Sequence, residues 1–290
     1  MNLEPSTSDG DNKDGFVYAA DGLKLDGLMI ERLSRIGISQ GIVAPMGKTF
    51  IKGYSCHFKL KADNISAAIL NSKVALHFNI GHDSKSNDFP TISSQIGYIR
   101  VFLQQHQNET PIAIHTHNKA IIEQIIRLKN EFPSQTFIIV GGQEAYMIAD
   151  QISRAKISIV LSPWRCTAKF WENRHCSPNM PLSESSIEIL YKAGVQFSIA
   201  YDEATNLRRI FWEVGSAAKS IESTNFTFVE TVNLITSVEE IFGIEQNKNL
   251  LIFEHNPFEF GANIALSVED GRVERCYPNV EEILHGNLLF

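Results

Sequence analysis

The amino-acid sequence predicts an α/β fold in which a parallel sheet is followed by a small antiparallel unit. Short apolar runs alternate with amphipathic helical segments, a pattern typical of parallel strands joined by right-handed helical crossovers. The runs are apolar almost throughout, as in strands that are buried on both faces. Near the C-terminus the pattern changes to short β runs separated by turn residues.

Six apolar runs predict the strands of the parallel sheet. They are residues 39–44, 74–80, 111–114, 136–140, 157–161 and 195–200. Six strands do not close an eight-stranded barrel, unless weaker strands lie hidden within residues 49–60.

The segments between and after these runs have the apolar spacing of helices. In residues 120–128, for example, Ile121, Ile122, Ile125 and Leu128 fall on one face of a helix. The same spacing predicts helices at residues 23–36, 93–105, 143–155, 185–193, 206–218 and 231–242.

Three regions follow from these patterns. Residues 1–14 are small and polar and are predicted to be a disordered tail. Residues 15–245 form the α/β unit, and residues 246–290 form a C-terminal β annex. The annex has β runs at residues 250–254, 264–268 and 272–276. Asp270-Gly271 separates the last two runs and predicts a hairpin turn.

The composition indicates a globular protein that can bury a large core. A small-molecule substrate is the partner that we expect. The chain has 290 residues, 43% of them hydrophobic, and a net charge of -7 without a basic block. Neither a nucleic acid nor a membrane is therefore expected as a partner. No apolar run approaches the ~20 residues of a membrane span, and no signal-peptide pattern is present, so we expect a cytoplasmic location.

The four cysteines do not suggest a metal ribbon or a disulfide scaffold, because they lack C-x-x-C spacing. We expect reduced and at least partly buried thiols. The cysteines are Cys56, Cys166, Cys176 and Cys276.

Two histidines stand at the end of the apolar run 111–114. His115 and His117 are two residues apart on a strand, so both rings can face one cavity. Neutral imidazole is a common metal ligand, and the carboxyl ends of parallel strands are where sites are built. The alternative is that both are ordinary polar residues where a strand passes into a loop.

The run 74–80 carries a second pair of histidines. His77 lies inside the run and is interpreted as a buried core histidine with its hydrogen bonds satisfied. His82, followed by Asp83, lies at the carboxyl end of the run. It is either a further metal ligand or part of a turn.

Asp202 and Glu203 follow the run 195–200. A carboxylate at a strand end can ligate a metal and take a proton from bound water. Asp202 can also cap the helix that follows, with Glu203 favourable to its dipole, and the two roles are compatible.

Tyr146 and Arg165 are candidate substrate contacts, with Trp164 and Trp171 as pocket walls. Arg165 could bind a carboxylate in a bidentate fork. The preferred interpretation of the segment is a surface loop packed by its aromatic residues. No phosphate loop, G-x-G-x-x-G, G-x-S-x-G or H-E-x-x-H motif is present, which disfavours a nucleotide-dependent enzyme.

The order and spacing of several stretches resemble the amidohydrolase superfamily, in its imidazolonepropionase-like branch and among long fungal members. The stretches are residues 21–45, 74–82 with 92–97, 114–117 with 121–128, 139–146 with 157–163, and 256–259 with 268–273. The resemblance implies a distorted (β/α)₈ barrel, a β-sandwich made from both chain ends, and hydrolysis of carbon–nitrogen bonds with one or two divalent ions, often zinc. It also implies that His115 or His117 is the fifth-strand ligand and that Asp202 is the last-strand aspartate.

The chain departs from that family pattern at four places. The first-strand His-x-His has no counterpart, the first half of the β-sandwich is missing, and no histidine lies in residues 141–146. A bridging lysine or glutamate on the fourth strand is not visible either, although His77 and His82 lie near. We therefore expect an incomplete or distorted TIM-type barrel, with the C-terminal annex as a remnant of the sandwich. The open edge of such a barrel favours pairing with a second copy.

The expected function is metal-dependent hydrolysis of an amide or cyclic amide. One ion, for which zinc is the first candidate, would lie between His115, His117 and Asp202. His82 would be an additional ligand. The alternative is an inactive paralogue or fragment, without a metal, that serves as a binding or assembly module.

Overall fold

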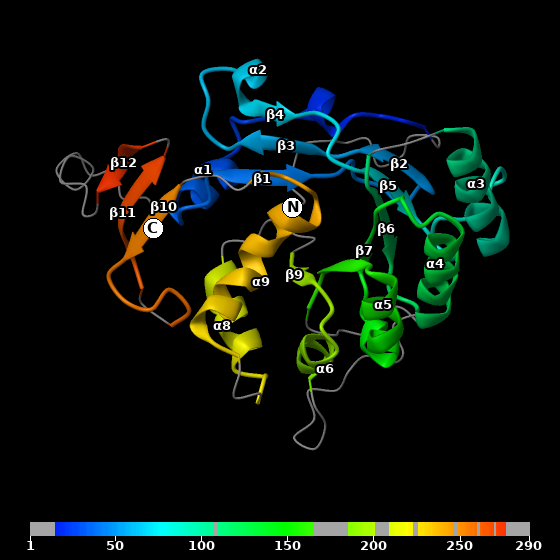
Figure 1. Ribbon diagram of the computed structural model, residues 1–290. Coiled ribbons are helices and arrows are strands. Elements are labelled where there is room, and N and C mark those ends of the chain that lie inside the picture. Colours follow the sequence, from blue (N-terminus) through cyan, green and yellow to red (C-terminus); the bar gives the residue numbers. More distant parts are fainter. Residues whose placement is uncertain are drawn as a thin grey trace.

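The computed structural model describes residues 15–106, 110–164, 185–200, 209–222, 226–245, 249–259, 262–269 and 271–276. The predicted disordered tail, residues 1–14, lies outside these ranges, as do Asp202 and Arg165. Within them the chain forms a mixed α/β fold with a six-stranded main sheet and two three-stranded sheets (Figure 1).

The main sheet has the strand order β2-β5-β6-β7-β8-β9. Its strands are β2 (Ile51–Tyr54), β5 (Leu76–Asn79), β6 (Ile112–Thr116), β7 (Phe137–Gly141), β8 (Ser158–Leu161) and β9 (Phe197–Ile199). β2 pairs with β5 in the antiparallel sense, and every later pair is parallel. Five of the six predicted strands are thus confirmed as sequential neighbours in a parallel sheet.

The predicted strand at residues 39–44 belongs to another sheet. β1 (Gln40–Val43) pairs antiparallel with β3 (Cys56–Lys59), which in turn pairs with β4 (Ile69–Asn71). Its assignment to the parallel sheet was wrong, because an apolar run predicts a strand but does not say which sheet that strand joins. The strands β3 and β4 that follow it provide a separate antiparallel sheet for β1.

The main sheet is open in the part of the chain that the structure describes. The weak strands suspected within residues 49–60 exist as β2 and β3. β2 pairs with β5 and forms an isolated parallel bridge between Tyr54 and Tyr18, whereas β3 lies in the other sheet. No described strand joins β9 back to β2, so the predicted barrel is not confirmed as a closed sheet.

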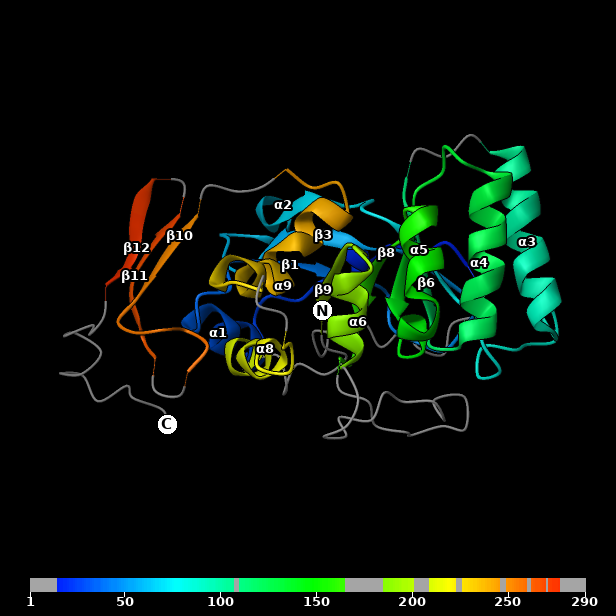
Figure 2. The same ribbon diagram turned by 60° about the horizontal axis from the view of Figure 1, so that its bottom comes forward.

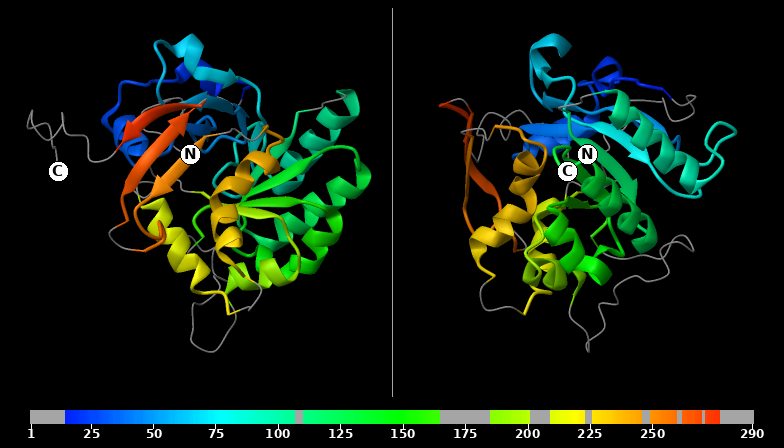
Figure 3. Two further views of the ribbon diagram at one scale, coloured as in Figure 1. Left: turned by 60° about the vertical axis from the view of Figure 1, so that its left-hand side comes forward. Right: turned by 45° about the vertical axis from the view of Figure 1, so that its right-hand side comes forward.

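Helices cover one face of the main sheet. These are α3 (Ile92–Gln105), α4 (Lys119–Glu131), α5 (Ala149–Ala155) and α6 (Ser186–Lys192), and Figure 3 shows their arrangement from two sides. Their buried apolar side chains belong to the same core cluster as those of the strands. Residues 143–155 were predicted as one helix, but they divide into a short 3-10 helix, η3 (Ala145–Ile148), and α5. This face is the larger part of the hydrophobic core.

The opposite face of the sheet is covered more thinly. α9 (Phe228–Ile241) and the following Phe242 pack on Ala113, Ile138 and Val160, which point away from the outer helices. These small and branched side chains leave room beside α9. The remaining described helices are η2 (Ala19–Gly22), α1 (Leu28–Arg35), α2 (Ile65–Ala68) and α8 (Ile210–Ala218). No described helix combines the length and apolarity that a membrane crossing requires.

The C-terminal annex contains the antiparallel sheet that the sequence predicts. β10 (Leu250–Phe253), β11 (Ile264–Glu269) and β12 (Arg272–Cys276) pair in that order, and Gly271 adopts a positive φ of 77° in the hairpin. The sheet lies at the end of the molecule opposite α3 and α4 (Figure 2). The ring of Phe253 packs against that of Phe211 on α8 at 5.3 Å. Cys56 on β3 is a free and buried thiol, as expected for that residue.

Two helical glycines make opposite demands on their surroundings. A Cβ added to Gly215 on α8 would lie 2.4 Å from the carbonyl oxygen of Phe258, whereas one added to Gly97 on α3 would meet open space.

We predict that Gly97→Ala raises the free energy of unfolding by about 0.5–1 kcal/mol, because alanine favours the helix. Gly215→Ala should lower it by about 1–3 kcal/mol, because the backbone of Phe258 must move. Urea unfolding of both variants measures this, and shifts of the same sign would contradict the packing described here.

Candidate functional site

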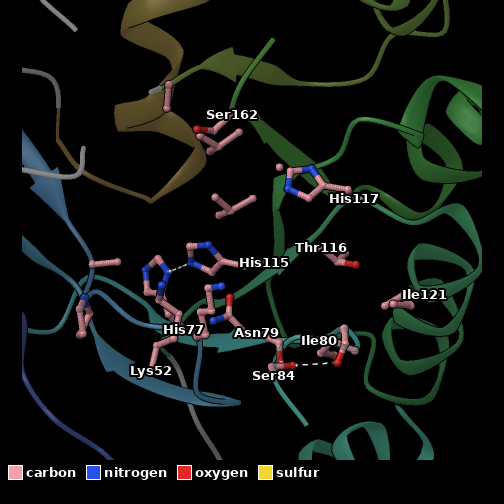
Figure 4. A pocket seen from close by; sticks show the side chains of 18 of the residues that line it. Lys52, His77, Asn79, Ile80, Ser84, His115, Thr116, His117, Ile121 and Ser162 are labelled. Atoms are coloured by element: carbon pink, nitrogen blue, oxygen red, sulfur yellow. Dashed lines mark hydrogen bonds between the residues drawn. The ribbon is translucent and has the colours of Figure 1, made fainter. Parts of the chain in front are cut away.

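A cavity of about 1020 Å³ lies at the carboxyl ends of the parallel strands, on the face that α9 covers. Its wall is largely apolar, and polar side chains gather where β2, β5 and β6 meet (Figure 4). Those polar side chains are Lys52, His77, Asn79 and His115.

The two central histidines are brought together by the parallel register of β5 and β6. His77 lies beside Ala113, and His115 lies beside Asn79, so both rings project from the same face of the sheet. Nδ1 of His77 is 2.8 Å from Nε2 of His115, and the close-up shows this contact at the cavity wall (Figure 4). The ring of Phe242 stacks on that of His77 with a centroid distance of 6.3 Å.

Burial keeps both imidazoles neutral. It lowers the pKa of His77 to about 3, with a smaller contribution from the charge of Lys52. Burial also lowers the pKa of His115 well below its ordinary value, followed by the charges of Lys52, His77 and His117. Near pH 7 the pair is therefore in the neutral form that binds metals.

His77 was interpreted as a core histidine with satisfied hydrogen bonds, and the structure differs from this. It is 3% exposed, but its Nε2 is buried and has no hydrogen-bond partner among the described residues. The apolar run around position 77 predicts that this residue is buried. It does not predict that His115 is its neighbour, because that depends on the register between β5 and β6.

His117 lies just beyond β6 and is fixed by the segment after β7. Gly141 has a φ of 108°, and a Cβ there would lie 2.7 Å from Cε1 of His117, so the ring occupies the space that the glycine leaves. The backbone N–H of Glu144 donates to the His117 carbonyl at 3.0 Å. The Glu144 carboxylate accepts from the backbone N–H of Lys119 at 2.7 Å. Sequence reasoning does not single out Glu144 as a residue that positions this turn, although a carboxylate shortly after a predicted parallel strand is the signal that could have found it.

The other candidate residues are placed differently. His82 is exposed at the rim of the same cavity, with its Nδ1 2.7 Å from Nζ of Lys85. Tyr146 lines a separate hollow of about 390 Å³ beside α5, together with Arg154 and Lys192. Asp202 and Arg165 lie outside the described residues, although Ala200, two residues before Asp202, lines the main cavity.

Two of the described side chains are of a type that binds metal ions, and their spacing can be compared with that of a zinc site. Zinc–nitrogen bonds are about 2.0–2.1 Å long, so two nitrogens on a tetrahedral ion lie ~3.3 Å apart. The 2.8 Å separation within the His77–His115 pair is that of a hydrogen bond, in which one ring donates its proton to the other. To hold one ion with these two nitrogens, the rings would have to move slightly apart and give up that hydrogen bond. Across the described ranges, however, no three or more His, Cys, Asp or Glu side chains gather as a metal-binding group. A complete site would need a donor from the undescribed segments.

Comparison with known proteins shows two similarities. No family model matches the chain. The chain is 22% identical to amidohydrolase tasK of Hapsidospora irregularis over 311 residues, which cover 84% of this chain and 31% of the relative. It thus spans about a third of the length of that curated relative.

The fold is similar to that of a solved amidohydrolase. The crystal structure of an amidohydrolase from Thermotoga maritima MSB8 matches with a TM-score of 0.75 and 18% identity, over 94% of this chain and 80% of that chain. The likeness shows that this mixed α/β fold with its parallel-rich sheet is one that an amidohydrolase adopts.

The contact between Gly141 and His117 can be tested with a matched pair of glycines. Gly141 and Gly243 both have positive φ, but a Cβ on Gly243 would meet nothing within 4 Å. Both alanine variants should lose about 1 kcal/mol of stability through backbone strain. Gly141→Ala should lose at least a further ~1 kcal/mol and shift the Cε1–H resonance of His117 in an NMR spectrum. Equal losses and an unmoved resonance would contradict this placement of the ring.

The neutral pair also predicts a dependence of stability on pH. The folded-state pKa of His77 lies below the unfolded value of about 6.5, so the unfolded chain takes up more protons as the pH falls. Stability is therefore full above pH 6.5 and is lost below it, by about 1 kcal/mol per pH unit for this one group. His77→Leu should flatten the loss measured between pH 6 and 5, whereas His255→Leu, at an exposed histidine of the annex, should not. If the free energy of unfolding falls equally steeply between pH 6 and 5 in both variants, His77 is not kept neutral in the folded state.

Proposed function

We propose that this chain belongs to the amidohydrolase superfamily, in its imidazolonepropionase-like branch, and hydrolyses a carbon–nitrogen bond of an amide or cyclic amide with the help of a divalent metal ion. The observation that carries the proposal is the pair of neutral imidazoles, His77 and His115, at the strand ends of a large cavity. The sequence similarity to amidohydrolase tasK and the fold shared with the Thermotoga maritima amidohydrolase support it.

In this proposal the chain's residues have separate tasks. His77 and His115 would hold the ion, for which zinc is the first candidate. His117 and His82 line the same cavity. When bound, such an ion makes a water molecule more acidic and polarises a carbonyl. Asp202 takes the proton as the water oxygen attacks the carbonyl carbon, and it then gives the proton to the leaving nitrogen when the C–N bond breaks.

Arg165 remains the proposed contact for a polar group of the substrate. Tyr146 is left out of the proposed site, because it lines the other hollow. The apolar wall beside α9 would shield the reacting groups from bulk water.

One observation favours a second candidate function. The described residues bring two imidazoles together but gather no group of three metal-binding side chains. A protein that keeps the fold and the cavity for binding or for self-assembly is compatible with this arrangement, and the open sheet edge would favour a homo-oligomer.

Metal uptake separates the two functions. After metal is removed over a chelating resin, the purified chain should take up about one zinc per chain. His77→Ala and His115→Ala should weaken uptake by more than the 10–100-fold typical of losing an outer-shell partner. His255→Ala removes an exposed histidine from the annex and should leave uptake unchanged. Elemental analysis and calorimetric titration measure this. A wild-type chain that takes up no stoichiometric zinc, manganese or iron would exclude the metallohydrolase and leave the binding function.

A further inference from the structure

Asn79 presents a side-chain amide at the polar end of the cavity. It lies on β5 two residues after His77, so both side chains project from the same face of the strand. In the register between β5 and β6 it stands beside His115. Figure 4 shows these three side chains at the cavity wall. A ligand that approaches the imidazole pair therefore also approaches the amide of Asn79.

The orientation of this amide is fixed by the loop before β2. Nδ2 of Asn79 donates to the carbonyl of Gly47 at 3.0 Å and to the carbonyl of Thr49 at 3.1 Å. These two bonds use both N–H groups of the amide. If the amide were turned over, Oδ1 would face two carbonyl oxygens and find no donor there. The nitrogen therefore belongs on the side of the loop, and the oxygen occupies the other branch of the amide.

Oδ1 of Asn79 is an acceptor that the described part of the protein does not use. The side chain's hydrogen bonds with described residues are the two that Nδ2 donates. The residue is half-buried, and its oxygen is not one of the buried polar atoms that lack a partner, so this atom is accessible. A ligand that keeps water away from the oxygen loses affinity unless it brings a donor of its own.

A second asparagine of the lining has the opposite arrangement. Oδ1 of Asn118 accepts from the backbone N–H groups of Ala120 at 3.0 Å and Ile121 at 3.4 Å, and so caps α4. Its oxygen is committed to the helix. Of the two asparagines in the described lining, Asn79 is therefore the one whose oxygen is available to a ligand.

The rest of the wall suits an apolar ligand body. Ile42, Val140, Val160, Val238 and Phe242 line the cavity from two sheets and from α9 and the residue just beyond it. Burial of an apolar body favours binding, but it does not distinguish two ligands of the same shape. A polar atom does distinguish them, because an acceptor that a ligand leaves buried without a donor weakens binding.

We propose that Asn79 is a specificity-determining residue, whose Oδ1 accepts a hydrogen bond from an N–H of the ligand. The inference deepens the proposed function, on which it rests in treating this cavity as the substrate site. The hydrolysed bond then belongs to an amide or lactam that carries an N–H. An ester of the same shape is disfavoured.

The proposal is tested by binding a matched pair of probes, 4-phenylpyrrolidin-2-one and 4-phenyloxolan-2-one. The second is the lactone that corresponds to the first, a lactam, and has a ring oxygen in place of the N–H. Calorimetric titration uses the full chain, with metal removed over a chelating resin so that no ion binds the ring carbonyl. The wild-type protein should bind the lactam about tenfold more tightly than the lactone, because the lactone places an oxygen against Oδ1.

Three variants assign that preference to one oxygen. Asn79→Asp and Asn79→Leu both lose the two bonds to the loop, so a difference between them reports the cavity-facing acceptor alone. Asn79→Asp keeps an acceptor and should retain the preference for the lactam, whereas Asn79→Leu should bind the two probes equally. Asn118→Ser keeps an oxygen that can cap α4 and should show the wild-type preference.

A measurement on the wild type makes the test independent of the folding of these variants. In protein labelled with nitrogen-15 in the asparagine side chains, the lactam should shift the amide resonances of Asn79 more than the lactone does. The amide resonances of Asn118 should respond equally to the two probes.

Several outcomes would overturn the proposal. These are equal binding of the two probes by the wild type, no binding of either, a preference that persists in Asn79→Leu, or an Asn79 amide that responds equally to both probes. A chain that prefers the lactam but takes up no metal would refute the proposed hydrolase and support this inference. A chain that takes up zinc without the preference would do the reverse.

Discussion

The site depends on the burial of two neutral imidazoles against each other. A polar group away from water is costly unless it is hydrogen-bonded, and an imidazolium in the same place would cost more. His77 and His115 meet this constraint in part, because Nδ1 of His77 and Nε2 of His115 share a hydrogen bond of 2.8 Å across neighbouring parallel strands. Nε2 of His77 remains without a partner among the described residues. The positions of Lys52, Phe242 and the cavity wall are all defined relative to this pair.

The surrounding chain fixes the pair from both sides. On the outer face, isoleucines of the strands such as Ile114 and Ile139 pack in one core with the buried side chains of α3 and α4. On the inner face, small residues such as Ala113 leave the space that becomes the cavity. Gly141 at the end of β7 and Glu144 just after it shape the turn that holds His117. Residues 141–144 thus end β7 and also fix the position of His117 at the end of the neighbouring strand β6.

Much of this fold could be predicted from apolar periodicity, which reports burial and element type. It gave the strands from residue 74 to residue 200 and the annex hairpin. It misplaced β1, because apolar content does not say which sheet a strand joins. It identified His115 and His117 by their position at a strand end, but it gave no weight to His77 or Lys52. Their proximity arises from the register between β5, β6 and β2, which only tertiary packing sets.

The central claim is that His77 and His115 form a neutral, hydrogen-bonded imidazole pair, and the proposed function adds that this pair exchanges its hydrogen bond for a metal ion. Nitrogen-15 NMR of the imidazole rings tests it most directly, because it reports the protonation of each ring nitrogen separately. At pH 7 both rings should be neutral, and added zinc should shift Nδ1 of His77 and Nε2 of His115 together. A ring that is protonated at pH 7, or zinc that shifts neither nitrogen, would contradict the claim.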